Sequence, residues 1–179
     1  MKQITAVVAL LFTIQFSFAQ NLRNNKFDLP VVENEIAFFE LDSVPNLTQA
    51  DFYQFGKDWF EQTYSVNKFS ADNKKTGDLS GSVTFKIDDQ NVKAPLNYSA
   101  KVTLKFINGV ASIKLHGLKY ISADTKSKSS VNVTYEVKQQ MLAKTDELYP
   151  DSWNSLKSYA NDLMQNFADF ISDKNMEKL

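Results

Sequence analysis

The chain has 179 residues, of which 43% are hydrophobic, 13% aromatic and 23% charged, and its net charge at pH 7 is −1. This length and composition allow a sizeable core, which excludes an intrinsically disordered protein. The near-neutral charge excludes a strong overall electrostatic attraction to nucleic acid or to an anionic membrane. The absence of cysteine excludes disulfides, thiol catalysis, thiolate metal sites and a cysteine-linked lipid anchor.

Residues 1–19 are typical of a cleavable secretory signal peptide. Lys2 supplies a positive charge, residues 4–18 are almost entirely apolar, and Ser17 and Ala19 are the small residues that a signal peptidase reads. We expect cleavage before Gln20 and a periplasmic or secreted product. The segment is too short for a stable membrane span, so we expect no span after cleavage.

The region after the signal predicts a tail, a strand and a helix in that order. Residues 20–32 are polar and predict a flexible N-terminal tail. Residues 33–44 predict a first strand. Thr48 is a good N-cap, and Asp51 can complete a capping box. Aromatic residues then recur at helical spacing through Tyr64, which predicts a helix.

From residue 66 to residue 121 the apolar period changes to two, which predicts antiparallel strands with one covered face and one wet face. Residues 66–71 predict a weak strand, and residues 72–77 predict a turn. Residues 79–88 and 96–106 predict longer strands, and Asn108-Gly109 predicts a tight hairpin turn into a return strand. The residues expected on the covered face include Val83, Val102, Leu104, Ile113 and Leu115.

The last third of the chain predicts a polar loop and a final helix. Residues 122–130 form the loop, residues 131–137 alternate like a further strand, and residues 139–148 allow a short helix. Asp151 is the expected N-cap of a helix over residues 151–173, whose apolar stripe has helical spacing. The chain therefore predicts one α+β domain over residues 33–179, a curved antiparallel sheet with two main helices packed on one face.

Residues 33–122 resemble the exported bacterial domain-of-unknown-function family 4468, which has a TBP-like fold. The matching stretches are EIAFFELDSVPNLTQADFY, the Trp59-Phe60 pair, GDLSGSVTF, and NYSAKVTLKFINGVASIKLHGLKYIS. The resemblance implies a TBP-like sheet and carries no assigned catalytic residues. DNA binding does not follow from such a fold, and Arg23 is the only arginine, so we expect no nucleic-acid partner.

The polar side chains of the alternating strands predict a candidate binding face. Its members are Lys86, Lys101, Thr103, Lys105, Lys114 and His116, with Lys138 expected beside them. Such a strip could attract an anionic glycan, a lipopolysaccharide phosphate or an acidic partner strand. The alternative is an ordinary solvated sheet face, where lysine also discourages unwanted strand pairing.

His116 is the only histidine, and it could act as a general base or as half of a nucleophilic pair. Without a nearby acid or a GxSxG motif in the sequence, an exposed strand residue is the alternative. One histidine and no cysteine exclude a conventional zinc site. We therefore expect no metal, no cofactor and no catalytic residues.

Other clusters have an ordinary structural explanation beside a functional one. The acidic residues Glu33, Glu35, Glu40 and Asp42 could form a glycosidase pair or serve solubility. Residues 88–91 gather oxygen ligands but lack the glycine of a calcium loop. The aromatic stripes Phe52/Phe55/Trp59 and Trp153/Tyr159/Phe167/Phe170 could line an apolar pocket or form the core. Asp42-Ser43-Val44 allows bacterial O-glycosylation.

These observations favour a non-catalytic exported domain that binds an envelope protein or glycan through the polar sheet face or a strand edge. The alternatives are a carrier of an apolar ligand between sheet and helices, and a hydrolase that uses His116.

Overall fold

The structure is a computed structural model, and it describes residues 28–33, 35–66, 68–88, 96–121, 130–133 and 150–178. The predicted signal peptide, the predicted helix over residues 139–148 and the predicted loop at residues 122–129 lie outside the described residues. The same holds for Lys138 and for residues 89–91.

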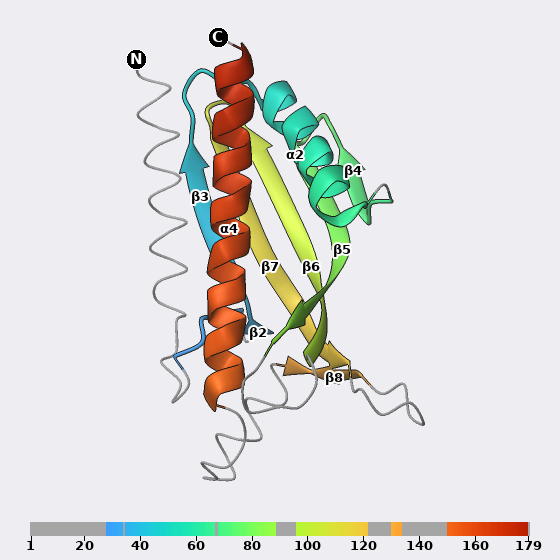
Figure 1. Ribbon diagram of the computed structural model, residues 1–179. Helices are drawn as coiled ribbons and strands as arrows, with labels where there is room; N and C mark the ends of the chain where they lie inside the picture. Colours follow the sequence, from blue (N-terminus) through green and yellow to red (C-terminus); the bar gives the residue numbers. More distant parts are fainter. Residues whose placement is uncertain are drawn as a thin grey trace.

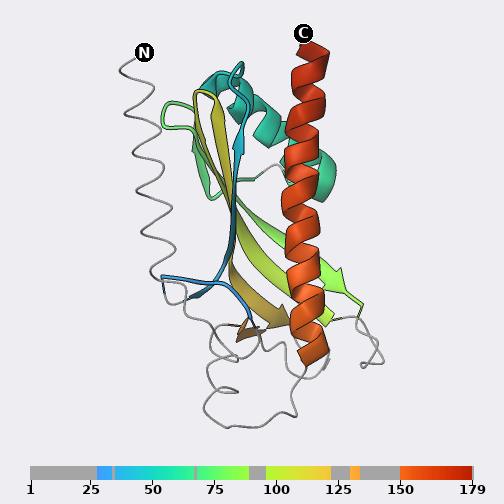
Figure 2. The same ribbon diagram turned by 90° about the vertical axis from the view of Figure 1, so that its left-hand side faces the viewer.

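An antiparallel sheet forms the centre of the fold (Figure 1). Its strands follow the order β3 (Phe38–Ser43), β7 (Val110–Ile121), β6 (Leu96–Ile107), β5 (Asp78–Ile87) and β4 (Ala71–Asn73), and β8 (Ser130–Asn132) also pairs with β7. A separate hairpin joins β1 (Val31–Val32) and β2 (Glu35–Ile36). Helices α2 (Gln49–Tyr64) and α4 (Pro150–Lys178) pack against one side of the sheet. Figure 2 shows α4 running along that side, so the other side is the open face.

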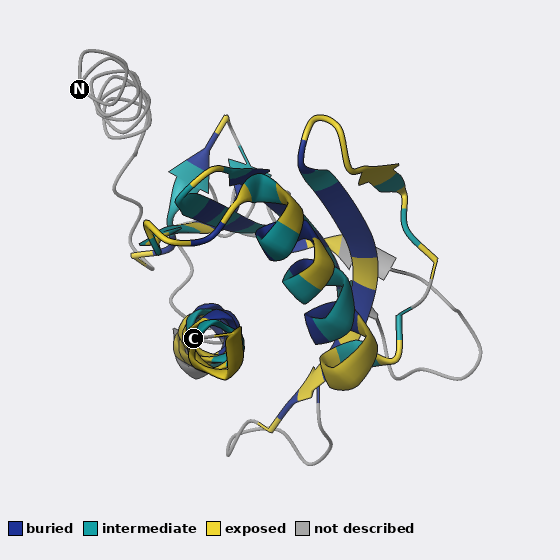
Figure 3. Ribbon diagram, turned by 90° about the horizontal axis from the view of Figure 1, so that it is seen from above, coloured by how far each residue is buried: buried dark blue, intermediate teal, exposed yellow. Residues whose placement is uncertain are grey.

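The side-chain alternation of the central strands separates the two faces as predicted. Val83, Val102 and Ile113 are buried under the helices, and so are Leu104 and Leu115. Polar and charged residues occupy the alternate positions of β5, β6 and β7. Figure 3 looks along α4 and shows its buried side turned one way and its exposed side the other. Burial of these two amphipathic surfaces against each other removes a large apolar area from water.

The predicted capping box starts α2. The Thr48 hydroxyl accepts a hydrogen bond from the Asp51 backbone N–H at 3.2 Å, and the Asp51 carboxylate accepts one from the Thr48 backbone N–H at 2.9 Å. These contacts satisfy backbone donors that a helix start leaves unpaired. The Lys178 Nζ atom at the end of α4 lies 2.6 Å from the Asp51 carboxylate, so the same residue joins the two helices.

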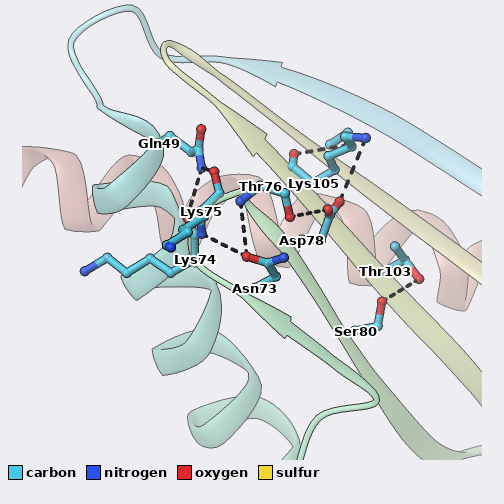
Figure 4. Close-up of polar contacts among 10 residues, drawn as sticks. Gln49, Asn73, Lys74, Lys75, Thr76, Asp78, Ser80, Thr103 and Lys105 are labelled. Carbon is cyan, nitrogen blue, oxygen red and sulfur yellow. Dashed lines mark hydrogen bonds and ion pairs between the residues drawn. The ribbon is translucent and has the colours of Figure 1, made fainter.

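The turn between β6 and β7 also holds the start of α2 in place. The Asn108 side-chain oxygen accepts a hydrogen bond from the Gln49 backbone N–H at 2.8 Å, and the Gly109 N–H donates to the Leu47 carbonyl at 2.9 Å. The Gln49 side chain donates in turn to the Lys74 carbonyl at 3.0 Å, on the β4–β5 turn (Figure 4). The Asn108-Gly109 hairpin predicted from the sequence therefore orients a helix as well as reversing the chain.

The two aromatic stripes belong to the core or pack against it. The Trp59, Phe52 and Phe167 side chains are fully buried, and the Trp59 and Phe167 rings meet edge to face at 5.2 Å. The Trp59 indole N–H donates to the Asn166 side chain at 2.8 Å, and the Tyr64 and Tyr159 hydroxyls lie 3.1 Å apart. These contacts join α2 to α4 above the sheet.

The N-terminal tail is shorter than predicted. Residues 28–32 were expected to be flexible, but Leu29 and Val32 are buried, and Val31–Val32 forms β1. The Lys157 Nζ atom of α4 lies 2.8 Å from the Asp28 carboxylate. The prediction was wrong here because three apolar residues in a polar segment gave too weak a periodicity. The predicted strand over residues 33–44 is also interrupted, since β2 ends at Ile36 and β3 begins at Phe38.

Four further boundaries differ from the predictions. Residue 66 and residues 68–70 are not in a strand: β4 begins only at Ala71, after a helix end at which Ser65 is left-handed with φ 54°. Pro150, not Asp151, begins α4, because proline suits the first helical position, where its missing N–H has no partner to lose. The helix continues to Lys178, and the strand predicted after residue 130 is β8, which ends at Asn132.

Candidate functional site

The open face brings together five of the six predicted binding residues. Lys101, Thr103 and Lys105 lie on β6, and Lys114 and His116 lie on β7. The strand register places Lys101 opposite His116 and Thr103 opposite Lys114. Lys86 shares the face but lies toward the end of β5, opposite Asn97.

A line of hydrogen-bonding side chains crosses the middle of this face. The His116 Nε2 atom lies 3.0 Å from the Thr103 hydroxyl, and its Nδ1 atom lies 3.3 Å from the Glu35 carboxylate. The Ser80 hydroxyl, which is buried, donates to the Thr103 hydroxyl at 3.0 Å (Figure 4). Four residues from β2, β7, β6 and β5 thus form one continuous polar network.

A β-bulge follows His116 directly. The register between β6 and β7 shifts between Ser99 and Lys101, and Gly117 has φ +61°, a left-handed conformation that glycine adopts without steric cost. In a regular strand, Leu115 and Leu118 would face opposite sides of the sheet because side chains alternate. The extra residue of the bulge allows both to be buried on the same side. Bulges often occur beside functional sites, where they change the direction of a side chain.

The surroundings of His116 favour its neutral form. Burial is the largest cause and lowers the histidine pKa from 6.5, and the charges of Lys114 and Lys101 lower it further, while Glu35 opposes them. A carboxylate facing Nδ1 favours the proton on that nitrogen. The Nε2 atom can then accept a proton from the Thr103 hydroxyl, which is the arrangement that general-base chemistry needs.

The lysines of this face differ in their partners. Lys114 Nζ lies 3.4 Å from the Glu33 carboxylate and 3.7 Å from that of Glu35, and Lys105 Nζ lies 3.9 Å from Asp78. Three lysines of the face, Lys86, Lys101 and Lys119, have no ion pair in the part of the chain that the structure describes. The face therefore keeps an excess of positive charge.

The sequence analysis did not name Ser80 or Lys119, and it placed Glu35 in an acidic cluster without connecting it to His116. Lys119 pairs with Ser99 and lies on the open face only because the bulge shifts the alternation of side chains by one residue. Gly117 is the signal that could have indicated this shift. Glu35 approaches His116 through the β1–β2 hairpin, which no local pattern predicts.

The acidic residues of the first strand do not form a carboxylate pair across a cleft. Glu33 and Glu35 contact Lys114 on the open face, whereas Glu40 and Asp42 pair in register with Ile113 and Ala111, whose side chains face the helices. Burial, with a smaller contribution from Glu40, raises the pKa of Asp42 to about 6. One Asp42 carboxylate oxygen is buried without a hydrogen-bond partner among the described residues.

Within the described ranges, no three acidic or histidine side chains are grouped so that they could hold a metal ion. The same ranges contain no helix that is both long and apolar enough to cross a membrane. A surface hollow of about 390 Å³ lies at the margin of the sheet, and it is lined by Ser65, Val66, Lys68, Phe69, Ser70 and Ser82.

Two solved structures are similar to this fold. A DUF4468 family protein from Bacteroides ovatus matches with a TM-score of 0.64 and 15% sequence identity, over 80% of this chain and 90% of that chain. A TBP-like protein from Parabacteroides distasonis matches with a TM-score of 0.67 and 12% identity, over 80% of this chain and 97% of that chain. No family model matches the sequence, and no curated protein matches it. The resemblance seen in the sequence is thus confirmed for the fold, and the chain has a TBP-like α+β fold, a curved antiparallel sheet with two helices on one face.

Proposed function

We propose that the protein is an exported, non-catalytic domain that binds an anionic component of the bacterial envelope, a glycan or a protein, through its open sheet face. The observation that carries this proposal is the set of lysines around His116 that have no carboxylate partner among the described residues, on a face that helices α2 and α4 leave uncovered. Lys101 and Lys119 flank the bulge, and Lys86 extends the positive surface along β5.

The chemistry of the face suits an anion better than a neutral ligand. Lysine ammonium groups act as point charges on flexible stems, so they can adapt to carboxylates or phosphates at several spacings. The Thr103, Thr84 and Ser82 side chains add neutral hydrogen-bonding groups on the same face. Binding of this kind weakens as ionic strength rises, because the charges are exposed to solvent.

Charge reversal tests the proposal. Lys101→Glu combined with Lys119→Glu should reduce binding of polygalacturonate, an anionic glycan, at least tenfold in isothermal titration calorimetry at low salt. Lys74→Glu combined with Lys75→Glu is the matched control, because these exposed lysines lie in the β4–β5 turn and give the same change in net charge. Equal affinities for the two double variants would rule out the open face.

Export is part of the proposal and has its own measurement. Mass spectrometry of the protein recovered from a bacterial host should find a mature chain that begins at Gln20, in the periplasmic or extracellular fraction. A product in the cytosol that retains residues 1–19 would contradict export.

A second candidate function, ester hydrolysis, is favoured by the Thr103–His116–Glu35 line alone. The Thr103 hydroxyl would act as nucleophile, the neutral His116 would accept its proton at Nε2, and Glu35 would orient the ring. His116→Asn should then abolish both hydrolysis of p-nitrophenyl acetate and labelling of Thr103 by a fluorophosphonate, whereas Thr84→Val should change neither. Absence of labelling in the unchanged protein would reject hydrolysis.

A further inference from the structure

Among the described residues, the second half of β5 has a free edge. β4 pairs with residues 78–80 of β5 only, while β6 pairs with the other side of β5 as far as Ile87. Figure 1 shows β4 ending beside the upper half of β5. Beyond Ser80, no strand in the described part of the chain pairs with this side of β5.

The hydrogen bonds of β5 show which backbone groups face this edge. The Gly77 carbonyl accepts a bond from the Phe106 N–H of β6 at 2.9 Å, whereas the Ser80 carbonyl accepts one from Ser70 on the opposite side at 2.8 Å. Because backbone groups alternate along a strand, those of Ser82, Thr84 and Lys86 point to the free side. They have no hydrogen bond there among the described residues.

The free edge is held in a fixed conformation from the helix side. The side chains of Val83, Phe85 and Ile87 are buried. The Phe85 ring also stacks on the Tyr159 ring of α4, with centroids 4.0 Å apart. A strand that is already ordered loses little conformational entropy when it pairs with a partner.

The surface hollow lies where β4 leaves β5. Val66 and Phe69 form its apolar side, and Ser82 of β5 forms part of its rim. The Phe69 ring is fixed against Phe60 with centroids 5.4 Å apart. Two exposed lysines flank this region, Lys68 in the lining and Lys86 farther along β5, and neither has an ion pair within the described ranges.

We propose that the β5 edge takes up an extended acidic peptide segment of another protein as an antiparallel strand that continues the line of β4. The partner's backbone would pair with Ser82, Thr84 and Lys86, and one apolar side chain on its helix side would enter the hollow. Acidic side chains on its open-face side would lie beside Lys86. This mode of binding takes its affinity from main-chain hydrogen bonds and its selectivity from alternate side chains. It shares Lys86 with the open face but does not use the residues around His116.

A synthetic six-residue peptide of alternating glutamate and valine provides the probe. On addition to the full-length protein, it should slow amide hydrogen exchange of Ser82, Thr84 and Lys86 at least tenfold, measured by nuclear magnetic resonance. The same peptide N-methylated at alternate residues cannot form the ladder and should leave exchange unchanged. Lys86→Glu should weaken binding of the unmethylated peptide about fivefold, and Lys101→Glu should not.

Three results would overturn this inference. The first is unchanged exchange at the three amides with the peptide in excess, and the second is equal binding of the methylated and unmethylated peptides. The third is slow exchange of these amides without peptide, together with a dimer in sedimentation analysis, which would show that a second copy of the chain occupies the edge.

Discussion

At the scale of single residues, the contact between His116 and Glu35 affects the pKa of a side chain in the middle of the open face. The Glu35 carboxylate comes from a hairpin that lies outside the main sheet, and it is 3.3 Å from the His116 Nδ1 atom. It opposes the burial and the lysine charges that lower the histidine pKa. The hairpin therefore tunes the charge state of a residue on β7.

Replacement of this carboxylate should be visible in the histidine titration. In Glu35→Gln the pKa of His116 should fall below its value in the unchanged protein, because a neutral amide no longer favours the imidazolium. The chain has one histidine, so a single proton resonance reports the titration. Glu33→Gln is the control, since Glu33 contacts Lys114 and not the ring. An unchanged or higher pKa in Glu35→Gln would contradict the contact.

Asp42 offers a second test at this scale. In the folded protein its pKa is about 6, above the ordinary 3.8, so folding is more favourable when the carboxyl group is protonated. This contribution to the free energy of unfolding is lost as the pH rises from about 4 to about 6. Asp42→Asn should therefore raise the free energy of unfolding by about 1 kcal/mol above pH 7, a figure reduced because the group is only half buried. Urea denaturation near pH 3 should show no difference.

Asp78→Asn is the control for Asp42→Asn. Asp78 accepts a hydrogen bond from Thr76 and lies 3.9 Å from Lys105 (Figure 4), so its replacement should not stabilise the protein at any pH. A stabilisation by Asp42→Asn that persists at low pH would contradict a raised carboxyl pKa.

At the scale of elements, the turns decide how strands and helices meet. Gly77 has φ +71°, and its carbonyl accepts the Phe106 N–H, so the β4–β5 turn is fixed against β6. A Cβ atom at Gly77 would collide with the Phe106 carbonyl, whereas a Cβ atom at Gly117 would meet no atom within 4 Å.

These two glycines form a matched pair for mutation. Gly77→Ala and Gly117→Ala should each lower the free energy of unfolding by about 1 kcal/mol, because alanine disfavours a left-handed backbone. Gly77→Ala should lower the free energy of unfolding by about 2 kcal/mol more, because the backbone of β6 must move. Denaturant midpoints at a constant m-value measure both effects. Equal decreases in stability would show that the Phe106 carbonyl can move without lowering the free energy of unfolding.

Element positions were predictable where a local signal exists. The Thr48 capping box, the Asn108-Gly109 turn and the alternation of Val83 and Val102 all appear in the sequence, and the structure contains each of them. The β1–β2 hairpin was not predictable, because two-residue strands have no measurable period. The start of β4 was not predictable either, because a strand of three residues has no measurable period.

At the scale of the whole molecule, the two-sided sheet explains how the fold produces a candidate site. The helices bury one face and so stabilise the strands, which leaves the other face free to carry Lys101, Thr103 and His116 in fixed register. The sequence predicted that Lys101, Thr103 and His116 share that face, but it missed Lys119, which the bulge places there. It could not predict the network among them, because Glu35 and Ser80 come from strands whose pairing is long-range.

The open face is the proposed binding surface of the protein. Chemical-shift mapping with polygalacturonate tests it most directly, because backbone amide resonances report binding residue by residue. We expect the shifts to concentrate at five residues of the open face and to vanish at high salt. These residues are Lys101, Thr103, Lys114, His116 and Lys119. Shifts confined to α2 and α4, or shifts that high salt leaves unchanged, would contradict it.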